Sequence, residues 1–369
     1  MTRFWLGGYG PAMGGAADGI GLLAGDADAA TALSYRGAVT STPSPSWLAR
    51  HPSLDVVYAA LEGDSAVQAF ARTGETALTP LGEPVEAGQF VCHVAVAPSG
   101  RFLIASCYGD GRVVRIGIDA EGRLIPDAAN NAAELRAALL GEPFDAAAPA
   151  GVAAAASDRY AGALTATGEA RVSHAHAAAF LPDGRIATTD LGFDLVRIWR
   201  PSAGVLTLDH EVVLPEGVGP RHMVVHPSAH LHVVTEYSCE VFTLATGPDG
   251  TWGVVSAVLA SPIAQVGTDF PAELARSRDG QILYTALRGS NTIAALRVRG
   301  SGESVESFAL SDSGVDWPRH HLVFEGKLLV AGQRSDSIAL LDLDERTGAP
   351  LGIRHQAAAP APTHFLPVR

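Results

Sequence analysis

A repeated strand pattern constrains the fold of this chain more than any other feature of its sequence. Six related segments each run strand, tight turn, strand, Gly/Ser/Asp turn and strand, and a further apolar stretch usually follows. The segments begin at Ser46, Cys92, Ser173, Gly219, Phe270 and Trp317. Their period of roughly 45 to 50 residues, broken by one longer interval, is that of a four-stranded propeller blade.

The two ends of the chain supply a seventh unit. Phe4 to Gly8 and Gly19 to Leu23 have the composition of strands, and Thr363 to Val368 provides another. Pairing of the termini within one blade would close the ring and remove a free sheet edge, whereas a solenoid would need capping units. We therefore predict an all-β, seven-bladed β-propeller of four-stranded blades, closed by its terminal strands and forming one domain over residues 1–369.

One connection is longer than the others by roughly thirty residues. It runs from about Asp119 to Val172 and contains the Ala-rich stretch NNAAELRAALLGE from Asn130, which has helical propensity and ends before Pro143. We expect a partly helical insert at about 119–172. It could cover one mouth of the channel, pack on the rim or form a subunit contact.

Composition excludes several classes of partner. The 40 glycines and 23 prolines favour short strands and turns, and the net charge of −13 argues against nucleic acid or an anionic membrane. Three cysteines without CxxC spacing fit a reduced, cytoplasmic protein, and no apolar run is long enough for a signal peptide or a membrane span. Because Lys327 is the only lysine, a bound anion would meet arginine forks. We expect a monomer or weak homodimer.

The segment GPRHMVVHPSAHLHVVTEY, from Gly219 to Tyr237, is predicted to be a hairpin. A hairpin returns the chain to the edge it left, so Arg221 and His222 at its start should meet Glu236 at its end. His226, His230 and His232 lie at the far turn or on the second strand, and we expect them to be surface or packing residues.

In a propeller, the start of strand one and the end of strand two recur at one opening in every blade. The first set holds Trp47, His93, His174, His176, Arg221, His222, Glu273, Arg319 and His320, and the second holds Glu62, Tyr108, Asp190, Glu236, Arg288 and Arg334. We predict that these titratable groups converge on one concave ligand site. For Glu273 and Asp190 a structural ion pair is an equally good interpretation, and Arg197 is expected to be solvated.

No metal or cofactor is predicted. His174 and His176 share one strand face, but no carboxylate or cysteine nearby in sequence completes a metal site. The GxSxG, HExxH, GxGxxG and Walker motifs are absent.

The chain resembles the lactonase family of seven-bladed propellers, which includes bacterial 6-phosphogluconolactonases and carboxy-cis,cis-muconate lactonizing enzymes. The resemblance spans nearly the whole sequence and is carried by CHVAVAPSGRFLIASCYGDG, SHAHAAAFLPDGR, GPRHMVVHP with VTEY, FPAELARSRDG with LRGSNTIA, and WPRHHLVFEGKLLVAGQRSDSI. It implies an active-site set of His174 or His176, Arg221, Glu236 and Arg288. Neighbouring positions depart from the family pattern at Ser173, Thr235, Leu287 and Cys107.

These observations lead to three functional hypotheses. The first is hydrolysis of a small anionic sugar lactone or phospholactone, with Glu236, His174, His176, Arg221 and Arg288 as catalytic residues and His93, Tyr108, His222, Glu273, Arg319 and His320 as substrate-binding residues. The second is the reverse chemistry of a lactonizing cycloisomerase, which needs the same anion cradle and proton donor. The third is a non-catalytic propeller that binds a ligand or protein.

Overall fold

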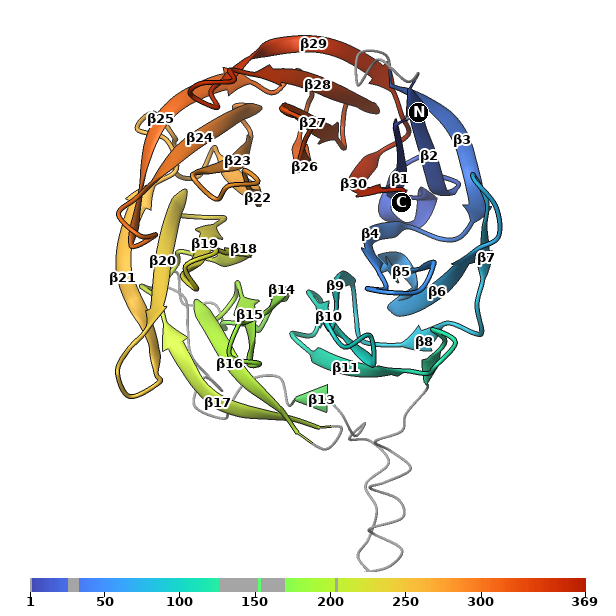
Figure 1. The fold of residues 1–369 in the computed structure, drawn as a ribbon, viewed down its shortest axis with the longest axis horizontal. Coiled ribbons are helices and arrows are strands. Elements are labelled where there is room, and N and C mark those ends of the chain that lie inside the picture. The colour runs from blue at the N-terminus through green and yellow to red at the C-terminus, as the bar shows by residue number, and fades with distance from the viewer. Residues whose placement is uncertain (1, 26–32, 126–151, 154–169, 203–204) are drawn as a thin grey trace, which may run out of the picture.

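Seven antiparallel sheets stand around a central channel in the computed structural model (Figure 1). The structure describes residues 2–25, 33–125, 152–153, 170–202 and 205–369. The innermost strands are β30, β4, β9, β14, β18, β22 and β26, one from each sheet. The predicted seven-bladed β-propeller is confirmed.

The first blade closes the ring with strands from both ends of the chain. It contains β1 (Thr2–Gly8), β2 (Gly19–Gly25), β3 (Ser34–Ser41) and β30 (Pro362–Pro367). The register places Trp5 opposite Leu366 and Leu6 opposite Phe365. Main-chain pairing therefore joins the N- and C-terminal strands, as predicted, and the two ends of the chain lie close together (Figure 1).

The other six blades follow one another along the chain. The second blade contains β4 (Pro45–Arg50), β5 (Val56–Leu61), β6 (Ala66–Arg72), β7 (Leu78–Pro80) and β8 (Val85–Glu86), and the third contains β9 (Val91–Val96), β10 (Phe102–Cys107), β11 (Val113–Ile118), β12 (Leu124–Ile125) and β13 (Val152–Ala153). The fourth contains β14 (Ala175–Phe180), β15 (Ile186–Asp190), β16 (Leu195–Ser202) and β17 (Val205–Val213), and the fifth contains β18 (Pro220–Val225), β19 (Leu231–Thr235), β20 (Glu240–Thr246) and β21 (Trp252–Leu259). The sixth contains β22 (Phe270–Arg276), β23 (Ile282–Arg288), β24 (Thr292–Arg299) and β25 (Ser304–Asp312), and the seventh contains β26 (Pro318–Phe324), β27 (Lys327–Gly332), β28 (Ser337–Leu343) and β29 (Pro350–Ala358).

The core lies between neighbouring blades. Second strands such as β5 and β23 are buried along their whole length, because both of their faces pack against other sheets. Outer strands such as β29 alternate between half-buried and exposed residues. One repeated latch joins blades: His51 Nε2 contacts the Gly100 carbonyl at 3.0 Å, and His226 Nε2 contacts the Gly280 carbonyl at 3.1 Å. His226 is therefore a packing residue, as expected.

Most of the predicted insert, including its helical stretch from Asn130, lies outside the described residues. Within it, Val152–Ala153 forms β13 and pairs with β11. No helix in the described part of the chain is long and apolar enough to cross a membrane.

Candidate active site

The first strand of every blade has an irregularity near its start, where it faces the channel. The register shifts between Pro220 and His222 in β18 and between Pro318 and His320 in β26. A bulge inserts one unpaired residue and re-aims its side chain. The residues left out of register there are Arg221 and Arg319, so both arginines occupy the same special position, two blades apart.

The ends of the second strands form a ring above these bulges. Strand register aligns Glu236 with Tyr9, Glu62, Tyr108, Arg288 and Gln333. Two predicted members are wrong. Gln333 holds the position that was assigned to Arg334, whose guanidinium instead stacks over Trp317 at 3.5 Å.

The second, Asp190, ends β15 one position short of the level of Glu236 and is fully buried, and the alternative interpretation of it as part of a structural ion pair is the one found. It pairs with Arg197 at 2.6 Å and also accepts hydrogen bonds from the Ser173 hydroxyl and the His174 backbone. Arg197 was expected to be solvated, but it is only 2% exposed because β15 and β17 cover it with Asp190 and Glu211. Asp190 is thus a structural residue that holds the loop carrying His174.

One charge cluster of the site joins Arg221, Glu236 and Arg288. Glu236 Oε2 lies 2.7 Å from Arg221 Nε and 2.8 Å from Arg288 Nη2, and both guanidinium side chains are 5% exposed. Arg288 also donates to the Phe270 carbonyl at 2.9 Å. The predicted meeting of Arg221 with Glu236 is therefore found, and Arg288 joins them from the next blade.

Burial and ion pairing act in opposite directions on this cluster. Burial raises the pKa of Glu236, but Arg288 and Arg221 outweigh it, and the net pKa is lowered. Burial likewise lowers the pKa of Arg288, to about 10, against the opposing effect of Glu236. Glu236 is an ionised carboxylate that depends on two cations, so any group that draws those cations away will make it a stronger base.

An aromatic sector lies beside the charge cluster. His174 stacks on Tyr108 with ring centroids 4.3 Å apart, and its Nδ1 lies 2.6 Å from the Tyr108 carbonyl. A carbonyl only accepts, so His174 carries a proton on Nδ1, and Nε2 of the neutral ring is then an acceptor. The side chain of Tyr108 also hydrogen bonds to Tyr237, and the charge of Glu236 raises the pKa of Tyr108. Tyr237 was missed because it follows Glu236 in a turn and matches no repeated position.

A third sector contains Arg319, Glu62 and Tyr9. The Tyr9 hydroxyl lies 3.0 Å from both carboxylate oxygens of Glu62. Arg319 lies over the Tyr9 ring at 4.8 Å, reaches Gln333 Oε1 at 3.3 Å and comes only within 4.0 Å of Glu62. Tyr9 was also missed, although it directly follows the second strand of the closing blade, as Glu236 does in its own.

The floor of the site is a ring of aromatic and titratable side chains, each one residue beyond the bulge position. It consists of Trp47, His93, His222, Glu273, His320 and His364, and it adjoins His176, which occupies the bulge position of the fourth blade. The Trp47 ring lies 4.1 to 5.4 Å from the rings of His93, His222, His320 and His364. Because β18, which carries His222, lies across the channel from β4 (Figure 1), the indole of Trp47 spans the channel. His364 was missed, and alignment of THF with RHM would have found it.

The histidines of the floor are uncharged at neutral pH, and the carboxyl of Glu273 is harder to ionise than usual. Burial raises the pKa of Glu273 well above its usual range, against a lowering effect of Arg221. Burial also lowers the pKa of His176, His222 and His320 well below the usual value. Glu273 Oε1 lies 3.4 Å from His222 Nδ1, and its Oε2 lies 4.0 Å from His320 Nε2. Because these imidazoles are neutral, the two pairs are polar contacts and not salt bridges.

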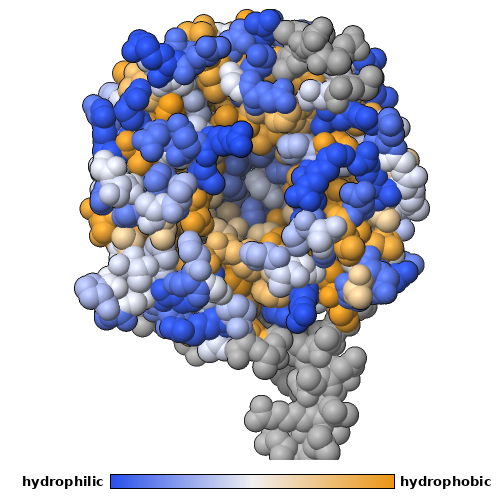
Figure 2. All heavy atoms as spheres, viewed as in Figure 1, coloured by the Kyte–Doolittle hydropathy of each residue, from blue (hydrophilic) through white to orange (hydrophobic). Residues whose placement is uncertain are grey.

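The described residues contain no group of three or more histidine, cysteine, aspartate or glutamate side chains arranged to hold a metal ion. A hollow lies in the middle of the propeller (Figure 2), and the side chains of the site come from the strands that surround the channel. Charged groups stand above a neutral aromatic floor. This arrangement can bind an anion and move a proton at Glu236.

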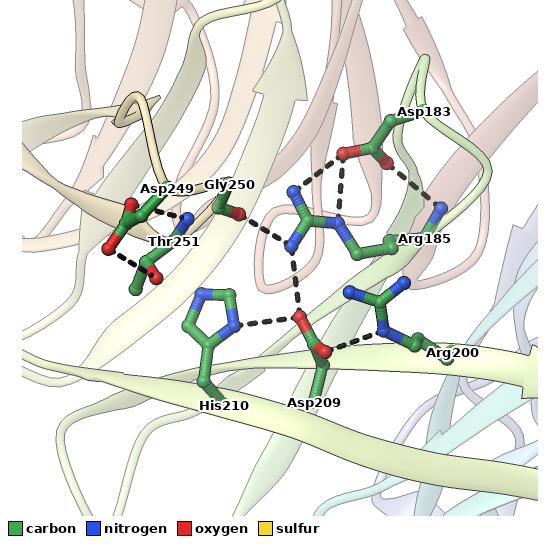
Figure 3. A pocket seen from close by; sticks show the side chains of 8 residues that line it. All are labelled: Asp183, Arg185, Arg200, Asp209, His210, Asp249, Gly250 and Thr251. Carbon is green, nitrogen blue, oxygen red and sulfur yellow. Dashed lines mark hydrogen bonds and ion pairs between the residues drawn. The ribbon is translucent and has the colours of Figure 1, made fainter.

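A second pocket, of about 380 Å³, lies between the turns of the fourth and fifth blades (Figure 3). Asp209 accepts from Arg200 at 2.6 Å, from Arg185 at 2.9 Å and from His210 at 2.9 Å. Arg185 also donates to the Gly250 carbonyl at 2.8 Å. The acidic and basic groups of this pocket satisfy one another, which is typical of an inter-blade clamp.

The comparisons with known proteins agree with the fold. The family model "Lactonase, 7-bladed beta-propeller" matches residues 3–367. A 6-phosphogluconolactonase of Bacillus subtilis (strain 168) is 26% identical over 361 residues, covering 94% of this chain and 93% of that protein. Solved structures from Lactobacillus plantarum and of the periplasmic gluconolactonase of Pseudomonas aeruginosa have TM-scores of 0.83 and 0.82 at 22% and 20% identity, covering all of this chain and 100% and 99% of theirs.

The chain therefore belongs to the lactonase family of seven-bladed β-propellers. Its membership and its relatives support a lactone-hydrolysing enzyme.

Proposed function

We propose that this protein hydrolyses an anionic sugar lactone of the 6-phosphogluconolactone type at the Arg221–Glu236–Arg288 cluster. The observation that carries the proposal is the position of Glu236, whose Oε2 is shared by Arg221 and Arg288 in a buried pocket. The name of the Bacillus subtilis relative supports the substrate class. A carboxylate beside two guanidinium groups combines a base with cations for an oxyanion.

The reaction uses Glu236 twice. Glu236 takes a proton from water as the water oxygen bonds to the lactone carbonyl carbon, and the carbonyl oxygen becomes an oxyanion beside Arg221 and Arg288. The arginines then also interact with the oxyanion, so they stabilise the ionised form of Glu236 less. Glu236 therefore holds its proton more tightly. When the acyl carbon–ring oxygen bond breaks, Glu236 returns that proton to the departing alkoxide, and the product is a hydroxy acid.

His174 and Tyr108 are assigned to orientation of the substrate at the side of the pocket. The stacked pair offers a flat face, and His174 Nε2, the ring nitrogen left without a contact to the Tyr108 carbonyl, hydrogen bonds to a sugar hydroxyl. His176 and the histidines of the floor supply neutral hydrogen-bonding groups.

The test measures ring opening of aldono-, phosphoaldono- and muconolactones by wild-type protein and by the Glu236→Gln and Arg221→Ala variants. Loss of a general base or of an oxyanion partner is expected to lower kcat by about 10²- to 10⁴-fold. Arg299→Ala is the control, because Arg299 forms an exposed pair with Glu306 on outer strands. Activity that survives in both site variants within a few-fold would refute the assignment.

The same panel separates the competing hypotheses. Ring closure of a muconate, without hydrolysis of sugar lactones, would identify a lactonizing cycloisomerase. No turnover of any lactone, together with ligand binding that tolerates Glu236→Gln, would identify a non-catalytic propeller.

A further inference from the structure

Three arginines face the pocket, and they differ in how firmly they are partnered. Arg221 and Arg288 both lie within 2.8 Å of Glu236 and are 5% exposed. The side chain of Arg319 is 18% exposed, and its nearest carboxylate oxygen, on Glu62, is 4.0 Å away. Arg319 is therefore the arginine of this cluster that is best placed to take a new anionic partner.

Glu62 contacts Tyr9 more closely than it contacts Arg319. The Tyr9 hydroxyl is 3.0 Å from both Glu62 oxygens, so the carboxylate is already engaged. Burial, more than any other effect, raises the pKa of Tyr9 well above its usual range, so this hydroxyl remains a donor. The Tyr9 ring also supports the guanidinium of Arg319 from below, at 4.8 Å.

Arg319 belongs to the same electrostatic unit as the proposed reacting centre. Its charge acts on Glu236, on Arg288 and on His176, which come from three other blades. In the cluster, three guanidinium groups face the carboxylates of Glu62 and Glu236, while Glu273 contacts the imidazoles of His222 and His320 instead of an arginine. One positive charge is left unmatched within the cluster, and it lies on the arginine with the loosest pairing.

We infer that Arg319 is the specificity residue that binds the anionic substituent of the substrate, a phosphate or a carboxylate, while the lactone carbonyl faces the Arg221–Glu236–Arg288 cluster. A guanidinium presents two parallel N–H donors that match an oxyacid group. Tyr9 and Gln333 hold the guanidinium of Arg319 in place, and the carboxylate of Glu62 partly offsets its positive charge. The inference rests on the proposed function for the identity of the reacting end.

The first experiment measures binding and needs no turnover. The probes are 1,5-anhydroglucitol, its 6-phosphate and the analogue with a carboxylate at carbon 6, which share a sugar ring and lack the lactone carbonyl. By calorimetry, wild-type protein should bind at least one charged analogue at least tenfold more tightly than the neutral one. Arg319→Gln should weaken that charged analogue by about 30-fold and change the neutral one by less than threefold. The better of the two charged probes identifies the anion.

Glu62→Gln provides a test with the opposite sign. The variant removes a negative charge beside Arg319 but keeps an oxygen that can accept from Tyr9, so the charged analogue should bind several-fold more tightly. Arg319→Lys keeps the charge without the fork and should give an intermediate loss. If thermal unfolding shows that Arg319→Gln does not fold, the Glu62→Gln and Arg319→Lys variants provide the test in its place.

Turnover separates the failure of this inference from the failure of the proposed function. If wild-type protein opens no lactone but Arg319 still governs binding of the charged analogue, the proposed function fails and the inference stands. If lactones are opened but Arg319→Gln leaves charged and neutral probes equally affected, the inference fails and the proposed function stands. Absence of any preference for the charged analogues in wild-type protein would overturn the inference directly.

Discussion

Mild acid is expected to unfold this protein, because seven buried histidines must remain neutral in the folded state. They are His93, His176, His222, His232, His320, His321 and His364, each less than 8% exposed. Burial is the largest cause of a lowered pKa in all seven: to about 3 for His93 and His364, to about 4 for His232 and His321, and well below the usual value for the other three.

The sign follows from proton linkage. Each folded-state pKa lies below the unfolded value, so the unfolded chain binds protons first as the pH falls. The stability from each neutral imidazole is fully present above the unfolded pKa of about 6.5 and is lost as the pH falls from there toward the folded pKa. At pH 5.5, one unit below that value, each histidine favours unfolding by about 1 kcal/mol.

Seven such groups together lower the free energy of unfolding by about 7 kcal/mol between pH 7.5 and 5.5, which is comparable to the whole stability of an ordinary domain. Glu273 acts in the opposite direction. Burial raises its folded pKa, so it contributes stability below its unfolded pKa, and that stability is lost as the pH rises through the folded pKa. The contribution of Glu273 alone offsets only part of the stability lost at the seven histidines.

The assay is urea unfolding followed by tryptophan fluorescence at pH 7.5, 6.5 and 5.5. A matched variant is His232→Phe, because strand register places Tyr58 and Tyr284 at the equivalent positions of other blades. It removes one titrating group and should reduce the loss by about 1 kcal/mol. A loss below about 2 kcal/mol in the wild-type protein would refute the reasoning, since it would mean that the folded state accepts these protons.

Two further predictions concern the closed ring and its thiols. Phe365→Ala should lower the free energy of unfolding by about 3 to 5 kcal/mol, because Phe365 is 1% exposed on the strand that closes the propeller; an unchanged urea midpoint would contradict this. Cys92, Cys107 and Cys239 should resist a thiol reagent until urea is added, since all three are buried. Burial also raises the pKa of Cys92 to about 12, that of Cys239 to about 11 and that of Cys107 further. Rapid labelling of the native protein would disprove this prediction.

The sequence predicted the blades well because the repeat samples the same structure seven times. The pairing of Phe4 to Gly8 with the last strand followed from the need to close a ring, and the hairpin argument brought Arg221 to Glu236. The failures at Arg334 and Asp190 came from assigning strand ends by their polar residues. Turn lengths differ between blades, and only strand register shows which residue stands level with Glu236.

Contacts between blades were the least predictable feature. Arg197 was misassigned because its partners, Asp190 and Glu211, lie on neighbouring strands and cover it from both sides. The loose pairing of Arg319 depends on Tyr9 and Glu62, which come from two other blades and meet only in the closed ring. No local pattern contains this information.

The neutral floor connects the proposed chemistry to the acid sensitivity. Buried neutral imidazoles packed around Trp47, with Glu273 beside His222, exclude water from beneath the Arg221–Glu236–Arg288 cluster. Because the floor is poorly solvated, the charge interactions above it are stronger than they would be in water. This strengthening stabilises an oxyanion. The same desolvation forbids protons on the histidines of the floor. The floor that strengthens the charge interactions of the site is therefore also the part of the fold that should unfold first in mild acid.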